Sequence, residues 1–494
     1  SNHTRNHTSN HTRNKFNSIN NYNTQFIVMS EQLYISQYRW KKTESSRLFK
    51  SIREKLQLQS LQFYMPLYSL YFYIHNTKKS HQTIDLTRKY YLTEITDIIK
   101  TKYYNSNVHA KGIIYDSDKQ IYEIRDIFCK QIPIIDPMHC IENNYSNSNT
   151  RNPYTPSCYN YNMFHKVNDL NNTAYIDVFC SYLFGTLTLH KKSPSFALFY
   201  GSWNGIGDYN YDITEDYSEL QLEKSFADNL GKTFTLDIYN SSEDESDADE
   251  DIVEDCVAKL KRVPIQCLCI ETLDYTLEDY LHDVSFKEEV LQSALFQIAF
   301  ALSYLQKRYN FTHNDLHINN IMYQDTDTQF LYYKLNNKYF KVPTYGKIFK
   351  IIDFGRAIFT FKNKVYRNDV FSRNGEAGGQ YSYPHQVSFL THRKDKYDTI
   401  GEPNYNFDLC RLSMTILEEI SKDKLSDPFK IFLEKMCTDR HGESFLEKDD
   451  DFQLYISIAK DAISAIPIDI IDDSIFHSYR ISKKRFPTKL YYTL

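Results

Sequence analysis

The chain has 494 residues, with 58 Lys and Arg against 63 Asp and Glu, and its formal net charge is −5. Because 41% of the residues are hydrophobic, the composition excludes a chain that is disordered throughout, and the acidic balance argues against a nucleic-acid binder driven by bulk charge. The nine Cys include no Cys-x-x-Cys pair, and no apolar run reaches the roughly 18 residues that a membrane span needs. We therefore expect a cytoplasmic protein with reduced thiols, without nucleic acid or a membrane among its partners.

The N-terminal part divides into a tail and an extension. "NHTRNHTSNHTRN" is a low-complexity repeat, so residues 1–29 are expected to form a disordered tail, and they lack the basic-then-apolar pattern of a secretory signal. Residues 30–80 are mixed and rich in aromatic side chains. Within them, residues 44–62 carry Leu and Ile at helical spacing, which predicts a helix in an extension packed on the β-rich part of the chain.

Strands dominate the expected structure of residues 81–270. "KGIIYD" and "IYEIRDIFCKQIPIID" alternate in polarity and are rich in Ile, which favours two strands. Residues 173–189 ("TAYIDVFCSYLFGTLTL") are expected to form a helix, and residues 195–203 a strand. The glycines of "GSWNGIG" (201–207) favour a loop, whereas "PIQCLCIETL" (264–273) is expected to be a short buried strand.

Two inserts interrupt this β-rich part. The first, over residues 137–170, is polar and has loop composition. The second, over residues 240–256, contains "SSEDESDADEDIVED", and such an acidic run is usually a solvated loop. The alternatives are an acidic docking segment or a tract phosphorylated on Ser241, Ser242 and Ser246.

Residues 271–494 are expected to be mostly helical. "EEVLQSALFQIAFALSYLQKRY" (288–309) is the strongest helix in the chain, because it is apolar nearly all round and therefore buried. It leads directly into "THNDLHINNIM" (312–322). Residues 328–345 alternate in polarity around Asn336-Asn337, which predicts an inserted hairpin.

The polar stretch after the long helix is the main candidate for chemistry. It has the pattern His-x-Asp-x-x-x-x-Asn in His313, Asp315 and Asn320, and 33 residues after the Asn an apolar run delivers Asp353-Phe354-Gly355. Two other interpretations remain open at this point. One is a zinc site that uses His313 and His317, and the other is a helix-loop-strand whose polar residues cap and turn the chain.

Both motifs in this order, behind a long buried helix, resemble the catalytic core of the protein-kinase-like fold. The wider pattern "HNDLHINNIM…KIFKIIDFGRA…GEAGGQY…NFDLCRL" resembles the divergent protein kinases encoded by giant DNA viruses of the mimivirus group. The resemblance implies an α+β, bilobal fold with a small β-rich N-lobe and a larger, mostly helical C-lobe. It also implies transfer of the γ-phosphoryl group of Mg²⁺-ATP to Ser or Thr hydroxyls of a protein substrate, in the host cytoplasm or the virion.

The resemblance implies roles for the residues of the two motifs. Asp315 would orient the attacking hydroxyl and accept its proton, and Asn320 and Asp353 would bind Mg²⁺ through hard oxygen atoms. His313 would brace the Asp-Phe-Gly turn, and His317 would lie on the substrate side. Asp408, in "NFDLCRL", would hold the loop rigid by accepting hydrogen bonds from its backbone N–H groups.

The resemblance also implies a nucleotide site. "IFCK" resembles the strand that ends in the nucleotide lysine, so Lys130 would contact the α- and β-phosphates. Its acidic partner from the next helix would be Asp177. In "CIETLDYTLEDYL", backbone groups from Glu271 to Leu273 would meet the edge of the adenine.

Several features depart from the family pattern. Asn314 replaces the Arg that normally binds a phosphate on the activation segment, and His317 stands where Ser/Thr kinases usually have Lys. No glycine-rich loop precedes Lys130, and no Ala-Pro-Glu follows Asp353. Two other functions therefore stay open. They are a small-molecule phosphotransferase of the aminoglycoside and choline kinase type, and a catalytically inactive pseudokinase scaffold.

Overall fold

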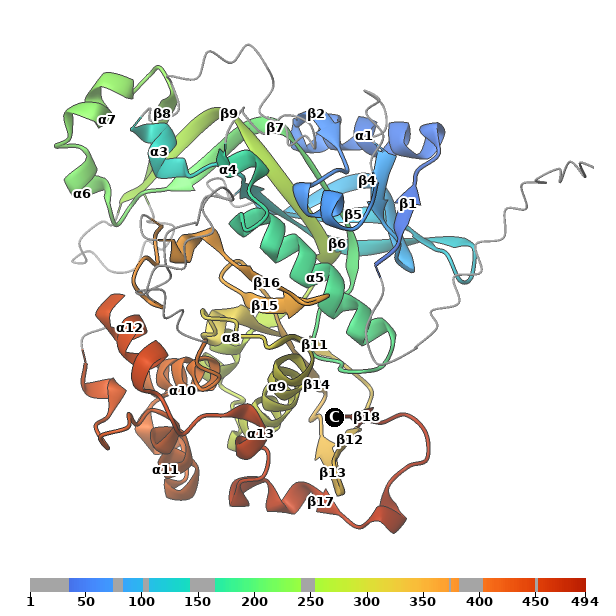
Figure 1. The fold of residues 1–494 in the computed structure, drawn as a ribbon, viewed down its shortest axis with the longest axis vertical. Helices are drawn as coiled ribbons and strands as arrows, with labels where there is room; N and C mark the ends of the chain where they lie inside the picture. The colour runs from blue at the N-terminus through green and yellow to red at the C-terminus, as the bar shows by residue number, and fades with distance from the viewer. Residues whose placement is uncertain are drawn as a thin grey trace, which may run out of the picture. The chain divides into compact units, whose positions relative to one another are not determined.

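The computed structural model describes residues 35–73, 83–100, 106–142, 165–240, 254–372, 375–381, 403–448 and 452–494. Residues 35–494 form one unit in which helices and strands are mixed (Figure 1). The expected tail over residues 1–29, most of the polar insert and the acidic run from residue 241 to 253 lie outside the described residues.

A seven-stranded sheet forms the framework of residues 59–271. Six of its strands follow the order β2-β7-β9-β6-β5-β4, and β8 pairs with β9. All of the pairings are antiparallel. The strands are β2 (Gln59–Gln62), β4 (Tyr90–Lys100), β5 (Val108–Asp116), β6 (Ile121–Pro133), β7 (Phe199–Asp212), β8 (Phe234–Asn240) and β9 (Glu254–Glu271).

Helices cover this sheet and its ends. Helix α1 (Lys42–Leu56) packs on β4, and α5 (Thr173–Leu189) packs on β7 and β9. The side chain of Asn172 caps α5 by accepting a hydrogen bond from the N–H of Ala174, and nearly the whole helix is buried. The shorter elements are β1 (Gln37–Arg39), η1 (Pro66–Leu70), β3 (Ile84–Leu86), α3 (Pro137–Ile141), α4 (His165–Asn168), α6 (Tyr217–Leu220) and α7 (Lys224–Asn229).

The second half of the chain is built around helix α9 (Glu288–Tyr309), which is buried along most of its length. A small sheet of order β10-β11-β14 takes one strand from before this helix and two from after it, and a two-stranded sheet pairs β15 with β16. These elements are α8 (Leu277–His282), β10 (Tyr275–Thr276), η2 (Ile318–Asn320), β11 (Ile321–Asp325), β14 (Lys347–Ile351), β15 (Ile358–Phe361), β16 (Lys364–Arg367), η3 (Asp369–Phe371), α10 (Phe407–Glu419), η4 (Lys422–Lys424), α11 (Asp427–Met436), η5 (Phe445–Glu447), α12 (Phe452–Asp461) and α13 (Pro467–Ile470).

The expected hairpin is present and is joined by the C-terminal residues of the chain. β12 (Phe330–Leu335) and β13 (Lys338–Pro343) pair around Asn336 and Asn337. β17 (Arg480–Ile481) adds to β13 and β18 (Tyr492–Thr493) adds to β12, so the order of this four-stranded sheet is β17-β13-β12-β18. Two 3-10 helices lie in the C-terminal segment, η6 (Ser474–Tyr479) and η7 (Lys483–Arg485).

Several expectations about local structure are confirmed, and others are wrong. The helices over residues 173–189 and 288–309 have the predicted bounds. The helix expected over residues 44–62 ends at Leu56, because Gln57 adopts a left-handed φ of 56°, and residues 59–62 instead form β2 of the main sheet.

The loop expected at "GSWNGIG" is part of the long strand β7. A Cβ on Gly205 would lie 2.7 Å from the carbonyl oxygen of Gln59, and one on Gly207 would lie 2.4 Å from a methyl of Leu58. These glycines therefore allow close approach of the neighbouring chain and do not mark a turn. The strand expected over residues 264–273 is also longer, because β9 begins at Glu254. The described ends of the polar insert form the short helices α3 and α4 instead of loop.

Candidate functional site

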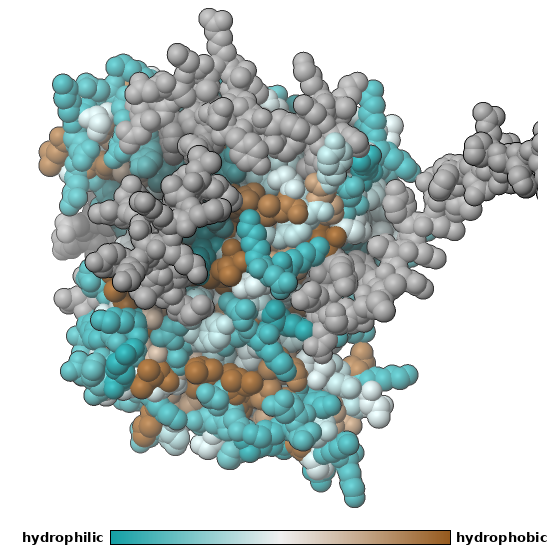
Figure 2. Space-filling model, in the orientation of Figure 1, coloured by the Kyte–Doolittle hydropathy of each residue, from teal (hydrophilic) through white to brown (hydrophobic). Residues whose placement is uncertain are grey.

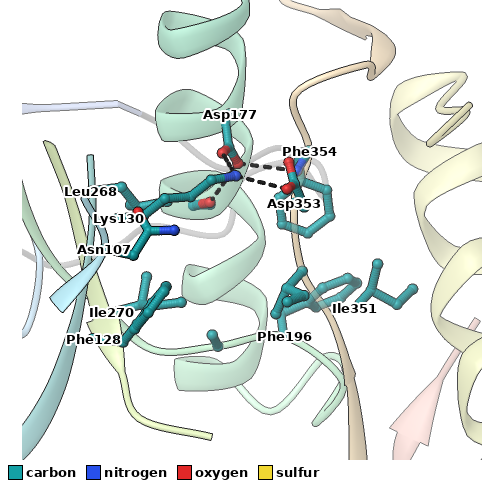
Figure 3. A pocket seen from close by; sticks show the side chains of 13 residues that line it. Asn107, Phe128, Lys130, Asp177, Phe196, Leu268, Ile270, Ile351, Asp353 and Phe354 are labelled. Carbon is teal, nitrogen blue, oxygen red and sulfur yellow. Dashed lines mark hydrogen bonds and ion pairs between the residues drawn. The ribbon is translucent and has the colours of Figure 1, made fainter. Parts of the chain in front are cut away.

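Three charged side chains from three separate elements meet beside a cavity. Lys130, near the end of β6, places its Nζ 2.8 Å from Asp177 Oδ2 and 2.8 Å from Asp353 Oδ2 (Figure 3). Asp177 comes from the second turn of α5, and Asp353 follows β14. The pairing of Lys130 with Asp177 that we inferred from the sequence is thus a direct contact, and Asp353 completes the cluster.

Asp177 also connects α5 to the turn that contains Asp353. Its Oδ1 accepts a hydrogen bond from the backbone N–H of Phe354 at 3.0 Å, while its Oδ2 faces Lys130. The ring of Phe354 is buried against Phe184 and His313, with centroid distances of 5.0 and 5.6 Å. Asp353 has a positive φ of 61°, which is uncommon for a residue other than Gly. The contacts on both sides of Asp353 hold this backbone conformation.

Lys130 and Asp353 keep their charges at neutral pH. Burial lowers the pKa of Lys130, but the carboxylates of Asp177 and Asp353 outweigh it and hold the pKa above its ordinary value. Burial raises the pKa of Asp353, but Lys130 and, more weakly, His313 outweigh it and hold that pKa at about 2. The pKa of Asp177 is raised, because the cost of burial exceeds the attraction of Lys130. The ammonium group of Lys130 is therefore held between the carboxyl groups of Asp177 and Asp353.

The cavity beside the cluster has a volume of about 170 Å³ and an apolar floor. Figure 3 shows Phe128, Ile270, Phe196 and Ile351 gathered on the side of the cavity away from the charges. An apolar slot that opens on a few polar groups is typical of a small-molecule site.

The residues proposed for the adenine edge are not among those that line the cavity. The cavity is lined by Leu268 and Ile270 of β9, and neither Glu271 nor Leu273 is among the lining residues. The backbone N–H of Glu271 donates to the carbonyl of Leu198, and its carboxylate forms a buried ion pair with Lys350. In this structure Glu271 thus joins strands together, and its N–H is already used.

The loop after α9 is held by Asp408, at the start of α10. The carboxylate of Asp408 accepts hydrogen bonds from the backbone N–H of His313, at 2.9 and 3.1 Å, and of Asn314, at 2.9 Å. Nε2 of His313 lies 2.9 Å from the carbonyl oxygen of Ile352, directly before Asp353. The described contacts of His313 and Asp408 are thus those that brace the loop and the Asp353 turn.

Asn320 is placed so that its amide oxygen can serve as a ligand. Its side-chain N–H₂ donates to the carbonyl of Asp315 at 2.8 Å, and its backbone carbonyl accepts from the N–H of Ile352 at 3.0 Å. The second contact joins η2 to the segment after β14 that carries Asp353, so the two proposed metal ligands come from adjacent backbone segments. One amide oxygen and one carboxylate suit a hard cation such as Mg²⁺.

His317 is unsuited to act as a permanent cation. Its Nε2 lies 3.0 Å from the side-chain nitrogen of Asn320, and burial lowers its pKa below the ordinary value of a histidine. The nearest cation to Asp315 among the described residues is Arg356, whose Nε lies 3.9 Å from Oδ2 of Asp315. Arg356 also pairs with Glu376.

Asn314 binds the segment that follows Asp353 through neutral hydrogen bonds. Its side-chain nitrogen donates to the carbonyl of Arg356 at 2.9 Å, and its side-chain oxygen accepts from the hydroxyl of Tyr381. An Asn with both ends of its amide used in this way holds the segment without a phosphate group.

Sequence reasoning missed Arg356, Lys350 and Asn107, which lines the cavity. Arg356 carried a usable signal, because it directly follows the Asp353-Phe354-Gly355 motif. Lys350 and Asn107 carried none, because their positions depend on strand pairing across the sheets.

Comparison with known proteins adds no relative. No protein-family model matches the chain, and no curated protein matches it either. Within the described residues, no helix is both long and apolar enough to cross a membrane.

Proposed function

We propose that this chain is an ATP-dependent phosphotransferase, and that it is a protein kinase acting on Ser or Thr hydroxyls. The observation that carries the proposal is the contact of Lys130 with both Asp177 and Asp353, at 2.8 Å each, beside an apolar cavity. A lysine fixed between a helix carboxylate and a metal-binding carboxylate is an arrangement that phosphoryl transfer uses to position a triphosphate.

The order of the elements supports the same proposal. A hairpin of two strands precedes the lysine strand β6, the helix with Asp177 follows, and β7 and β9 complete the sheet. Helices α8 and α9 come next, and they lead to the loop with Asp315 and then to Asp353. We propose on this basis that residues 81–270 and 271–494 correspond to the N-lobe and C-lobe of the protein-kinase-like fold, although β2 extends the first part toward the N-terminus.

In this mechanism Lys130 binds the phosphate oxygens of ATP, and Asp315 orients the acceptor hydroxyl. The hydroxyl oxygen bonds to the γ-phosphorus, the bond from that phosphorus to the β–γ bridging oxygen breaks, and its electron pair leaves with ADP. Asp315 accepts the hydroxyl proton. Asn320 and Asp353 would hold Mg²⁺, which when bound neutralises charge on the phosphates.

The proposal is tested by transfer of labelled γ-phosphate from Mg²⁺-ATP to the chain itself or to a generic protein acceptor. The wild-type chain should label the acceptor, and Asp315→Asn should lower the rate by at least about 100-fold. Asp423→Asn, an exposed Asp in the same half of the chain, is the matched control and should leave the rate unchanged.

Equal labelling by wild type and Asp315→Asn would overturn the role of Asp315. Absence of labelling from wild type, with both proteins folded, would overturn the proposed activity. Transfer to small cationic alcohols and to no protein would assign the chain to the small-molecule phosphotransferases instead.

A further inference from the structure

The four-stranded sheet of β17, β13, β12 and β18 concentrates positive charge in a chain whose net charge is negative. Residues 330–343 contain three Lys and no Asp or Glu, and residues 474–494 contain five Lys or Arg and no Asp or Glu. The two stretches are far apart in the sequence, and strand pairing brings them together. We call the surface formed by these two stretches the basic sheet.

Most of these cations face solvent. Lys338, Arg480, Lys483, Lys484, Arg485 and Lys489 are exposed. In Figure 2, hydrophilic side chains project at the lower edge of the view, where Figure 1 draws β17 and the turns around it. Within the described residues, no carboxylate lies within 4 Å of the three cations of η7, Lys483 to Arg485. Like charges crowded without counter-charges repel one another, so a bound anion would relieve this cost.

An open hollow of about 520 Å³ lies in the basic sheet, lined by Lys338 and Tyr339 from the hairpin and by Arg480 and Lys483 from the C-terminal segment. One carboxylate of the chain already binds to cations that line this hollow. Asp472 pairs with Lys338 and, at 2.6 Å, with Arg480. The hydrogen bond from Lys338, with the charge of Arg480, holds the pKa of Asp472 below its ordinary value. The ionised carboxylate of Asp472 is thus stabilised beside the hollow, and Lys483 to Arg485 remain available to bind further carboxylates.

We propose that the basic sheet is a docking surface for an acidic stretch of a polypeptide, rich in Asp and Glu. The aromatic side chains argue against single-stranded nucleic acid, whose bases need open rings on which to stack. The ring of Phe486 is packed against Tyr332 and Tyr339, with centroid distances of 6.0 and 4.9 Å, and against Tyr491 at 5.0 Å. These rings are only partly exposed, because they pack on one another within the chain, and the cations of η7 are more exposed than the rings are. The proposal does not depend on catalysis.

The test measures binding of a fluorescein-labelled peptide of alternating Glu and Asp to the full chain by fluorescence anisotropy. We expect saturable binding at about 50 mM NaCl that weakens strongly by about 300 mM, because exposed charges are screened by salt. Reversing three charges with Lys483→Glu, Lys484→Glu and Arg485→Glu together should weaken binding about tenfold or more. Lys484→Glu alone, which disturbs the fold least, should weaken it about threefold.

The matched control reverses three exposed lysines elsewhere, with Lys55→Glu, Lys224→Glu and Lys232→Glu, and should change the affinity less than about twofold. Circular dichroism shows whether each variant is folded. Failure of the wild-type chain to bind the acidic peptide, or equal losses in the control and the η7 variant, would overturn the proposal. Tighter binding of oligouridylate than of the acidic peptide at the same salt would assign the surface to nucleic acid instead.

Discussion

Within the described part of the chain, charged side chains are paired around Lys130 and largely unpaired on the basic sheet. Around Lys130, every charged group has a partner from another element: Nζ contacts Asp177 and Asp353, and Asp177 is only 1% exposed. On the basic sheet, exposed cations outnumber the carboxylates near them, and Asp472 alone pairs with two of them. Burial makes an unpaired charge costly, whereas solvent makes it cheap.

The paired charges around Lys130 can position a ligand, whereas the exposed charges of the basic sheet can attract an oppositely charged partner. A partly buried, fully paired cluster is set by the fold and can hold a small ligand in a fixed geometry. An exposed surface of one sign has little geometry of its own, and its effect is long-range and sensitive to salt. Substitutions should therefore change stability strongly in the first region and weakly in the second.

The largest effect is expected at a second buried pair, Glu271 with Lys350, whose side chains are 9% and 5% exposed. Lys350→Met leaves the carboxylate of Glu271 buried without its cation, so the free energy of unfolding should fall by about 3 kcal/mol. The double variant with Glu271→Gln should recover most of the loss, because no buried charge remains. Urea unfolding measures all three proteins. A double variant as unstable as the single one would contradict the pairing.

Lys130→Met comes next. It leaves Asp177 and Asp353 facing each other without a cation, but Lys130 is 22% exposed and solvent reaches the site. We expect a loss of about 2 kcal/mol at pH 7, measured by urea unfolding. Because protonation of Asp177 would relieve the repulsion, the loss should shrink as the pH is lowered. Lys111→Met, at an exposed lysine of the same sheet, is the control and should be close to neutral.

A smaller effect is expected from His317. Burial lowers the pKa of His317 in the folded chain. The positive charges of His313 and Arg411 lower it further, and Asp315 raises it in part. His317 therefore binds a proton more readily in the unfolded chain than in the folded one. The stability contributed by the neutral ring should be lost as the pH falls below about 6.5, with a slope of at most about 1.4 kcal/mol per pH unit. Unfolding of His317→Gln should depend less on pH between 7 and 5.5 than that of wild type, whereas the exposed control His477→Gln should match wild type. Identical pH profiles for wild type and His317→Gln would contradict the lowered pKa.

The smallest effect is expected on the basic sheet. Lys338→Gln removes one exposed partner of Asp472, and Arg480 still pairs with it. The free energy of unfolding should change by less than about 0.5 kcal/mol. A loss as large as that of Lys130→Met would show that the basic sheet is part of the structural framework and would remove the contrast between the two regions.

The sequence predicted correctly the helices and the hairpin whose formation depends on residues close together in the chain. The helices over residues 173–189 and 288–309 follow from continuous apolar composition, and the hairpin follows from alternation around Asn336-Asn337. The spacing of His313, Asp315 and Asn320 predicted that these residues share one short loop. The contacts of that loop with Asp408 and Ile352 are those of a rigid turn.

Features that depend on distant strands could not be predicted in the same way. Gly205 and Gly207 favour a turn when read alone, but in the sheet they make room for Gln59 and Leu58 beside β7. The basic sheet was hidden by the overall charge of −5, because its two halves come from separate stretches of sequence. The ion pair of Glu271 with Lys350 likewise joins β9 to β14.

The most direct test of the central claim is the dependence of ATP binding on Mg²⁺, measured by titration calorimetry for wild type and for Asp353→Asn. If Lys130, Asp177 and Asp353 form a nucleotide site, wild type should bind ATP more tightly with Mg²⁺ than without it. Asp353→Asn should lose that gain while staying folded, because a carboxylate ligand has been removed. Equal Mg²⁺ dependence in the two proteins, or no binding of ATP by wild type, would contradict the account.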